Sequence, residues 1–161
     1  MDDERILKAV VDEKFGRDLL PKIRGKYVVS ELEDIPAKEI TNFTNDQYLT
    51  VEITEDMTVW RVNDNGILAN KAGRYMTFTD IRGMTRDELK QFLAIKDEWN
   101  NITHIAEIKI PKGTKINIGT AKEQIEDDIK LSGGGDQIFL NVDNRFLEKI
   151  EKEWIISNDP L

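Results

Sequence analysis

The side chains best suited to chemistry lie in strand-like stretches of the chain from about residue 58 onward. Arg61 lies between Trp60 and Val62 in TVWRVNDN, so strand alternation would turn it away from both neighbours. A mid-strand arginine is commonly a solvent-exposed residue on the outer face of a sheet. The other interpretation is a guanidinium that binds a phosphate or ribose, because its planar donors suit bidentate recognition. The local pattern leaves both interpretations open.

A second group of candidates lies in the stretch GRYMTFTD. Arg74 offers the same options as Arg61, and Tyr75 is either a core aromatic or a flat face for an aromatic ligand ring. Thr77 would share a strand face with Tyr75, and its hydroxyl can make a hydrogen bond. The same composition is also typical of an ordinary strand.

Three consecutive glycines precede an apolar run in LSGGGDQIFL, residues 131–140. Glycines allow a positive φ and let backbone or a ligand approach closely. Asp136 and Gln137 follow directly, and Gln137 is either a satisfied edge residue or an amide that binds a ligand. Gln124, in GTAKEQ, is by itself more typical of a solvated loop residue. This part of the sequence therefore carries candidates, and no single one of them decides a function.

Composition removes several kinds of chemistry. The chain of 161 residues has no cysteine and a single histidine, His104, so thiolate chemistry is excluded and a histidine-based triad is implausible. No ligand set for a metal is evident, and a lone histidine is more often structural than catalytic. The net charge of -8 and the dispersed basic residues argue against a nucleic-acid binder. We expect no membrane span and no signal peptide, so an export address would lie outside this chain.

The elements that must position these residues change in character near residue 45. Before it, the chain is charged and predicts helical pieces interrupted by proline and glycine, with no evident chemistry. After it, β-branched and aromatic stretches predict strands, and Thr85 with Glu88 forms a capping box that opens a helix. We therefore expect an N-terminal helical segment or linker over residues 1–45. An α+β domain with a mostly antiparallel sheet is expected over residues 46–161.

Taken in order, WRVNDNG, GRYMTFTDI, EWNNITHIAEIKIPKGTKINIGTAKEQ and GGGDQIFL resemble the C-terminal toxin domains of bacterial polymorphic toxins, over about residues 57–142. These domains resemble the ADP-ribosyltransferase superfamily, and NAD-glycohydrolase toxins are the most similar in style. The resemblance implies a split sheet with an arginine on an early strand, an aromatic and hydroxyl-bearing strand beside nicotinamide, and an acid or glutamine opening a late strand. Arg61 matches the first landmark, Tyr75 and Thr77 match the second, and Gln137 matches the third.

The resemblance also implies roles in cleaving the nicotinamide–ribose bond of NAD+. Arg61 would hold the pyrophosphate or a ribose, Tyr75 would form a wall of the nicotinamide pocket, and Gln137 would bind the ribose hydroxyls. The glycines before Gln137 would leave room for the ribose. The other residues expected to contact substrate are Arg74, Thr77, Gln124, Gly134, Gly135 and Asp136.

The third landmark departs from the pattern, because transferases of this superfamily usually have glutamate where this chain has Gln137. An amide can hydrogen-bond a ribose but cannot act as a base. Water that attacks a dissociating ribose needs less base assistance than a protein acceptor, which favours hydrolysis. The leading hypothesis is an NAD+ glycohydrolase toxin, secreted or delivered to act in the target-cell cytoplasm. It would use NAD+ as substrate without a cofactor or metal, and a cognate immunity protein is the expected partner.

Two other hypotheses remain open. One is a mono-ADP-ribosyltransferase toxin that modifies a macromolecular target. The other is a non-enzymatic acidic module of the binding or immunity type, whose surface would neutralise a basic partner. Release of nicotinamide from NAD+, with or without a labelled acceptor, separates all of these hypotheses.

Overall fold

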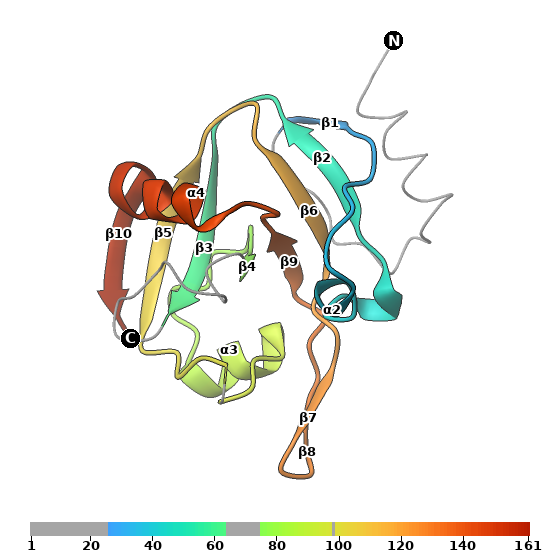
Figure 1. Cartoon of the computed structure of the whole chain (residues 1–161). Helices are drawn as coiled ribbons and strands as arrows, with labels where there is room; N and C mark the ends of the chain where they lie inside the picture. The colour runs from blue at the N-terminus through green and yellow to red at the C-terminus, as the bar shows by residue number, and fades with distance from the viewer. Residues whose placement is uncertain (1–25, 64–74, 98) are drawn as a thin grey trace.

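A computed structural model describes residues 26–63, 75–97 and 99–161 of the chain (Figure 1). Within these ranges the strands form two larger sheets and one small hairpin, with short helices around them. All of the paired strands run antiparallel. The predicted α+β class with a mostly antiparallel sheet is thereby confirmed.

The larger sheet has five strands and the smaller has three. In spatial order the larger sheet contains β1 (Tyr27–Val29), β2 (Leu49–Ile53), β6 (Lys115–Thr120), β9 (Asp136–Phe139) and β4 (Tyr75–Met76). The smaller sheet contains β10 (Ile155–Pro160), β5 (His104–Ile110) and β3 (Met57–Asn63). The hairpin of β7 (Gln124–Glu126) and β8 (Ile129–Leu131) projects from the rest of the molecule (Figure 1). The described helical elements are α2 (Ala37–Ile40), η1 (Thr44–Asp46), α3 (Arg86–Leu93), α4 (Asn144–Lys149) and the π-helical turn η3 (Ile150–Trp154).

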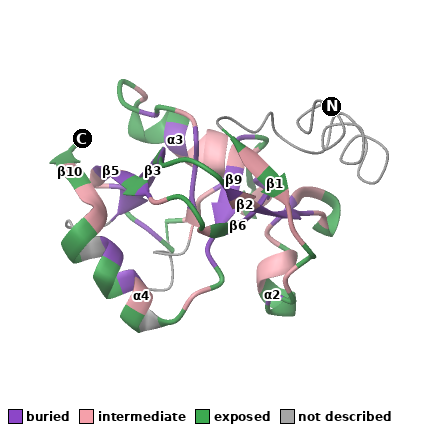
Figure 2. Ribbon diagram, turned by 90° about the horizontal axis from the view of Figure 1, so that it is seen from above, coloured by how far each residue is buried: buried purple, intermediate pink, exposed green. Residues whose placement is uncertain are grey.

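The two sheets meet where β3 runs beside the end of β4. Trp60 and Thr77 exchange two backbone hydrogen bonds there, with N–O distances of 2.8 and 2.9 Å. A shared hydrophobic core fills the space between the sheets, with Ile118 and Ile138 from the larger sheet and Ile108 from the smaller one. Figure 2 shows buried residues concentrated on the strands, whereas α2 and much of α4 are more exposed. The junction of the sheets is therefore held by backbone hydrogen bonds and by core side chains from both sheets.

Residues 26–45 pack as part of the same body as the predicted domain. β1 pairs with β2, and Phe43 is fully buried in a cluster with Tyr48 and Phe139. Phe43 also forms a bridge to Ala121. The predicted change near residue 45 therefore falls within one packed apolar cluster, and residues 26–45 form an integral layer of the fold. The helices predicted before residue 26 lie outside the described residues.

The helix α3 begins as predicted from its capping box. The Glu88 N–H donates to the Thr85 hydroxyl, and the Thr85 N–H donates to the Glu88 carboxylate, both at 3.1 Å. Leu89 is fully buried in a second core cluster with Trp60 and Val62. The helix thus covers the face of β3 opposite the main core, and its last residues approach the glycine-rich segment before β9.

Candidate active site

A cavity of about 400 Å³ lies beside the junction of β3 with β4. Its volume falls within the range of roughly 300–1,000 Å³ found for small-molecule sites. Strands of both sheets line it, together with α2 and the segments that follow α3 and β6. The described lining residues are Glu39, Asn42, Trp60, Arg61, Val62, Tyr75, Met76, Leu93, Ala94, Ile95, Trp99, Asn100, Lys122, Gln124 and Gln137. Four predicted site residues are therefore brought together: Arg61, Tyr75, Gln124 and Gln137.

Arg61 reaches this cavity from the middle of β3, opposite Ala106 of β5. It is only 2% exposed, so the interpretation as a solvated outer-face residue is wrong. The physical reason is that β3 is covered on both sides: Val59 packs into the main core and Trp60 packs into the cluster under α3. A cation held this deeply beside a cavity is well suited to an anionic ligand.

Gln137 lines the cavity from β9, where it pairs with Gly119 of β6. Its side chain is largely buried, and its Nε2 donates to the main-chain oxygen of Asn42 at 3.2 Å. The same oxygen accepts from the Lys122 N–H at 3.1 Å. These two bonds fasten the end of the α2 segment to the larger sheet and fix one donor of the Gln137 amide.

Tyr75 contributes both a ring and a hydroxyl to the cavity wall. Its ring packs against Phe139 with a centroid separation of 5.1 Å. Its hydroxyl donates to Glu39 Oε2 and accepts from Asn42 Nδ2, the latter at 2.9 Å. Burial, followed by the hydrogen bond to Glu39, raises the pKa of Tyr75 well above its ordinary value. The hydroxyl is therefore a neutral donor at physiological pH, and it links Glu39 to Asn42.

Thr77 and Asp136 have structural partners and are not among the described residues that line the cavity. The Thr77 hydroxyl accepts from the Thr79 N–H at 3.2 Å, beside the junction of the sheets. The Asp136 carboxylate accepts from the Phe78 N–H at 2.6 Å and from the Thr79 hydroxyl at 2.5 Å. Both residues therefore order the turn after β4, and no contact with a ligand in this cavity is supported for them.

Gly134 and Gly135 also lie outside the lining of the cavity. A Cβ added at Gly135 would lie 2.7 Å from both the carbonyl oxygen and the ring of Phe92, so the space beside it is already filled by α3. The Gly135 N–H donates to the Phe92 oxygen at 3.0 Å, and Gly134 donates to Ala121 from a φ of 87°. Gly135 lets the chain close against the end of α3, so it does not leave room for a ribose as predicted. The space beside Gly134 is open among the described residues, and its predicted role stays a prediction.

Gln124 and Lys122 line the cavity at the base of the β7–β8 hairpin. Gln124 is half-buried there, and the solvated-loop interpretation fits it poorly. The Lys122 ammonium lies 3.5 Å from the Asp46 carboxylate and is partly exposed. Arg74, the remaining predicted contact, lies outside the described residues. His104 is not among the described lining residues, and its Nδ1 lies 2.8 Å from the Thr103 hydroxyl.

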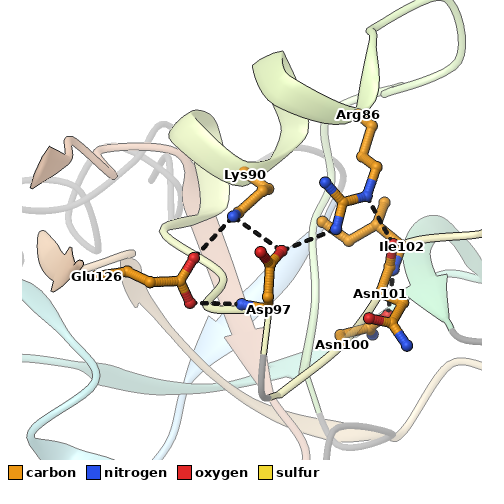
Figure 3. Close-up of polar contacts among 7 residues, drawn as sticks. All are labelled: Arg86, Lys90, Asp97, Asn100, Asn101, Ile102 and Glu126. Carbon is orange, nitrogen blue, oxygen red and sulfur yellow. Dashed lines mark hydrogen bonds and ion pairs between the residues drawn. The ribbon is translucent and has the colours of Figure 1, made fainter. Parts of the chain in front are cut away.

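The segment after α3 forms another wall of the cavity, which it lines with Ala94, Ile95, Trp99 and Asn100. A cluster of charged side chains holds this wall segment in place (Figure 3). Asp97 receives hydrogen bonds from Arg86 at 2.7 Å and from Lys90 at 2.8 Å. Its own N–H donates to Glu126 at 2.6 Å, and Lys90 also contacts Glu126 at 2.8 Å. The cluster thus ties this segment to α3 and to the hairpin.

The wall segment is also attached to β3. Asn100 is buried, its Nδ2 donates to the Val62 oxygen at 3.2 Å, and its Oδ1 accepts from the Ile102 N–H at 2.8 Å. Figure 3 shows Asn100 and Asp97 on the same stretch of chain. Trp99, between them, is 45% exposed and adds an indole ring to the cavity wall. An aromatic ligand could pack on this ring.

Sequence reasoning missed Glu39, Asn42, Lys122 and the wall after α3. Glu39 and Asn42 lie in the charged N-terminal stretch, where no local pattern distinguishes them from surface residues. They reach the cavity because Phe43 is buried against Gly119: a Cβ at Gly119 would lie 2.6 Å from the Phe43 ring. Lys122 lies two residues before a candidate, Gln124, and this proximity was the signal that could have found it.

The arrangement combines an apolar floor with a few polar groups. Trp60, Met76 and Trp99 offer apolar surface, while Arg61 and Lys122 are the cations among the described lining residues. Within the described ranges, no cluster of acidic or histidine side chains could hold a metal ion, and no helix is long and apolar enough to cross a membrane. Comparisons of the chain with protein-family models, with curated proteins and with solved structures found no match.

Proposed function

We propose that this chain is an NAD+ glycohydrolase that cleaves the nicotinamide–ribose bond in the cavity beside β3, β4 and β9. One observation carries the proposal: Arg61, Tyr75 and Gln137, which come from three strands of two sheets, line the same cavity. These residues match the successive landmarks of the ADP-ribosyltransferase superfamily. Their meeting at one site supports the resemblance more strongly than any of the motifs alone.

The chemistry of the lining residues suits the parts of NAD+. Arg61 and Lys122 provide positive charge for the pyrophosphate within a chain of net charge -8. Trp60, Met76 and Trp99 provide apolar surface for the nicotinamide ring. Gln137 has an amide oxygen to accept a hydrogen bond from a ribose hydroxyl while its nitrogen bonds Asn42.

The biological setting extends the same proposal. An enzyme of this kind would deplete NAD+ in a competitor or host cell, after delivery to the cytoplasm of that cell. Such an activity endangers the producing cell as well, so a cognate immunity protein is the expected partner. The two antiparallel sheets, which are bridged by backbone hydrogen bonds where β3 passes the end of β4, are compatible with the split sheet of the ADP-ribosyltransferase fold.

The test is the release of nicotinamide from NAD+ by the purified chain, compared with variants at Arg61 and Gln137. We expect Gln137→Ala to lower the rate by about 100-fold or more, as removal of a group that stabilises the transition state does in other enzymes. Arg61→Met should lower the rate at limiting NAD+ because it removes a charge that binds the pyrophosphate. Arg145→Ala, which removes an exposed arginine on α4, is the matched control and should retain the parent rate. Thermal melting of each variant separates loss of activity from loss of folding.

The outcomes discriminate among the hypotheses. A parent chain that leaves NAD+ intact overturns the proposal and favours a non-enzymatic binding module. A label transferred from NAD+ to an added protein or nucleic acid identifies a transferase instead. If folded variants of Arg61 and Gln137 keep the parent rate, the reaction does not take place in this cavity.

A further inference from the structure

We propose that Glu39 is the general base that activates the attacking water in this cavity, an inference that rests on the proposed hydrolysis of NAD+. The position aligned with the usual glutamate of the superfamily holds Gln137, whose amide cannot accept a proton at neutral pH. Among the described residues that line the cavity, Glu39 is the only carboxylate. Among the described lining residues, the carboxylate of the site therefore comes from α2 rather than from β9.

The position of Glu39 is fixed by a neighbour within the cavity. The Tyr75 hydroxyl donates to Glu39 Oε2, and the raised pKa of Tyr75 keeps this hydroxyl a donor. A carboxylate has two acceptor oxygens, so Oε1 can accept a hydrogen bond from water while Oε2 is bonded to Tyr75. A base oriented by a third group in this way loses less freedom when it takes up its proton.

Glu39 is connected to the amide proposed to bind the ribose. Asn42 Nδ2 donates to the Tyr75 hydroxyl, and Gln137 Nε2 donates to the main-chain oxygen of Asn42. One residue, Asn42, thus spans the distance between the base and the ribose-binding group. The burial of Phe43, next in the chain, holds Asn42 in place.

The charges around Glu39 are compatible with this role. Lys38, its neighbour on α2, is exposed, whereas Arg61 and Lys122 line the same cavity. When both cations engage the pyrophosphate of a bound NAD+, Glu39 is the carboxylate among the described lining residues that can accept a proton from water. The three charged side chains would then be divided between substrate binding and catalysis.

The proposed step balances without a further reactant. The water oxygen forms a bond to C1′ of the ribose, and a water proton passes to the Glu39 carboxylate. The C1′–N bond breaks, and its electron pair goes to the ring nitrogen, so the pyridinium becomes neutral nicotinamide. ADP-ribose and nicotinamide leave, and Glu39 returns the proton to solvent. The sum is NAD+ and water to ADP-ribose, nicotinamide and a proton.

The experiment measures kcat and KM for NAD+ in Glu39→Gln, which keeps the size of the side chain and removes the base. We expect kcat to fall by about 100-fold or more, within the range for loss of a general base, while KM changes little. Glu148→Gln, on the exposed side of α4, is the matched control and should keep the parent kcat. In Glu39→Ala, added formate should restore part of the lost rate, which a purely structural role would not allow.

The outcomes separate this inference from the proposed function. If the parent releases nicotinamide and folded Glu39→Gln keeps the parent kcat, Glu39 is not the base and hydrolysis by the cavity still stands. The inference also fails if formate restores no activity to folded Glu39→Ala. If the parent releases no nicotinamide, the proposed function itself fails. Should both Glu39 variants unfold, Tyr75→Phe replaces them: a fall in kcat of about 10-fold supports an oriented carboxylate, and an unchanged kcat overturns it.

Discussion

The two walls of the cavity are held by different forces. The wall that carries Glu39 and Asn42 is anchored by Phe43 and Ile35, which are buried in an apolar cluster with Tyr48. The wall after α3 combines apolar packing of Leu93 and Ile95 and the buried hydrogen bonds of Asn100 with ion pairs between Asp97 and the side chains of α3. Burial of a large apolar side chain contributes a few kcal/mol, whereas exposed ion pairs contribute about 1 kcal/mol or less.

Because the walls are anchored differently, we expect them to serve different purposes in the proposed reaction. Catalysis requires the groups that act on the ribose to stay within a fraction of an ångström of their working positions. The apolar anchor supplies that rigidity to Glu39 and Asn42. The wall that carries Trp99 needs only to cover the ligand, and part of its anchor is the weaker, salt-sensitive set of ion pairs at Asp97.

The largest effect is expected at Phe43. Phe43→Ala removes a fully buried ring, so we expect the free energy of unfolding to fall by about 3–5 kcal/mol. Urea denaturation measures this loss, and Val28→Ala, at an exposed position of β1, should cost far less. Because the anchor is apolar, the loss should be similar at low and high salt. A loss below about 1 kcal/mol would show that the α2 wall does not depend on Phe43.

A smaller effect is expected at the glycines where α3 meets β9. Gly135→Ala places a methyl group 2.7 Å from the Phe92 oxygen, so we expect a loss of about 1–3 kcal/mol. Gly134→Ala meets nothing within 4 Å and costs only its positive φ, about 1 kcal/mol. Chemical denaturation of the two variants tests this order. If Gly134→Ala were the more costly change, close packing against α3 would not be the reason that position 135 is a glycine.

The charged cluster should respond to salt, unlike the apolar anchor. We expect Lys90→Met to speed amide hydrogen exchange over the wall segment, chiefly at Ile95 and Asn100, with a minor change in overall stability. In about 1 M salt, where the screening length is about 3 Å, parent and variant should become similar. An undiminished difference between them at that salt concentration would contradict the electrostatic anchor.

The smallest effect is the pH dependence of the same wall. Lys90, followed by Arg86, lowers the pKa of Asp97 below its ordinary value of 3.8, so this contribution is present above pH 3.8 and is lost as the pH falls further. Asp97 and Glu126 raise the pKa of Lys90 above 10.5, so its contribution is lost only above that pH. Fluorescence of the parent minus that of Trp99→Phe reports on the wall and should stay constant between these limits. A change in this fluorescence difference near neutral pH that also occurs in Asp97→Asn would show that a group other than Asp97 controls the pH response of the wall.

Much of the fold could be predicted because its signals are local. The capping box at Thr85 and Glu88 depends on residues three positions apart, and it forms as expected. β-branched and aromatic stretches predicted the strands, including those of Arg61 and Gln137. The convergence of these two residues with Tyr75 was anticipated only through the ordered resemblance, since no local pattern relates β3 to β9.

The remainder depends on contacts between distant parts of the chain. Glu39 enters the cavity because Phe43 packs against Gly119, a contact that no periodicity encodes. Gln137 lines the cavity and Asp136 does not, because the carboxylate of Asp136 accepts a hydrogen bond from the backbone after β4. A strand pattern predicts that adjacent residues face opposite sides, but it cannot tell which side holds a ligand.

Hydrolysis of NAD+ in this cavity is tested by an assay of both products formed when the purified chain is incubated with NAD+. We expect nicotinamide and ADP-ribose to accumulate in equal amounts as NAD+ disappears, because water is the acceptor. The folded Gln137→Ala variant should form both far more slowly. NAD+ that remains intact in the presence of the folded parent chain would contradict hydrolysis in this cavity.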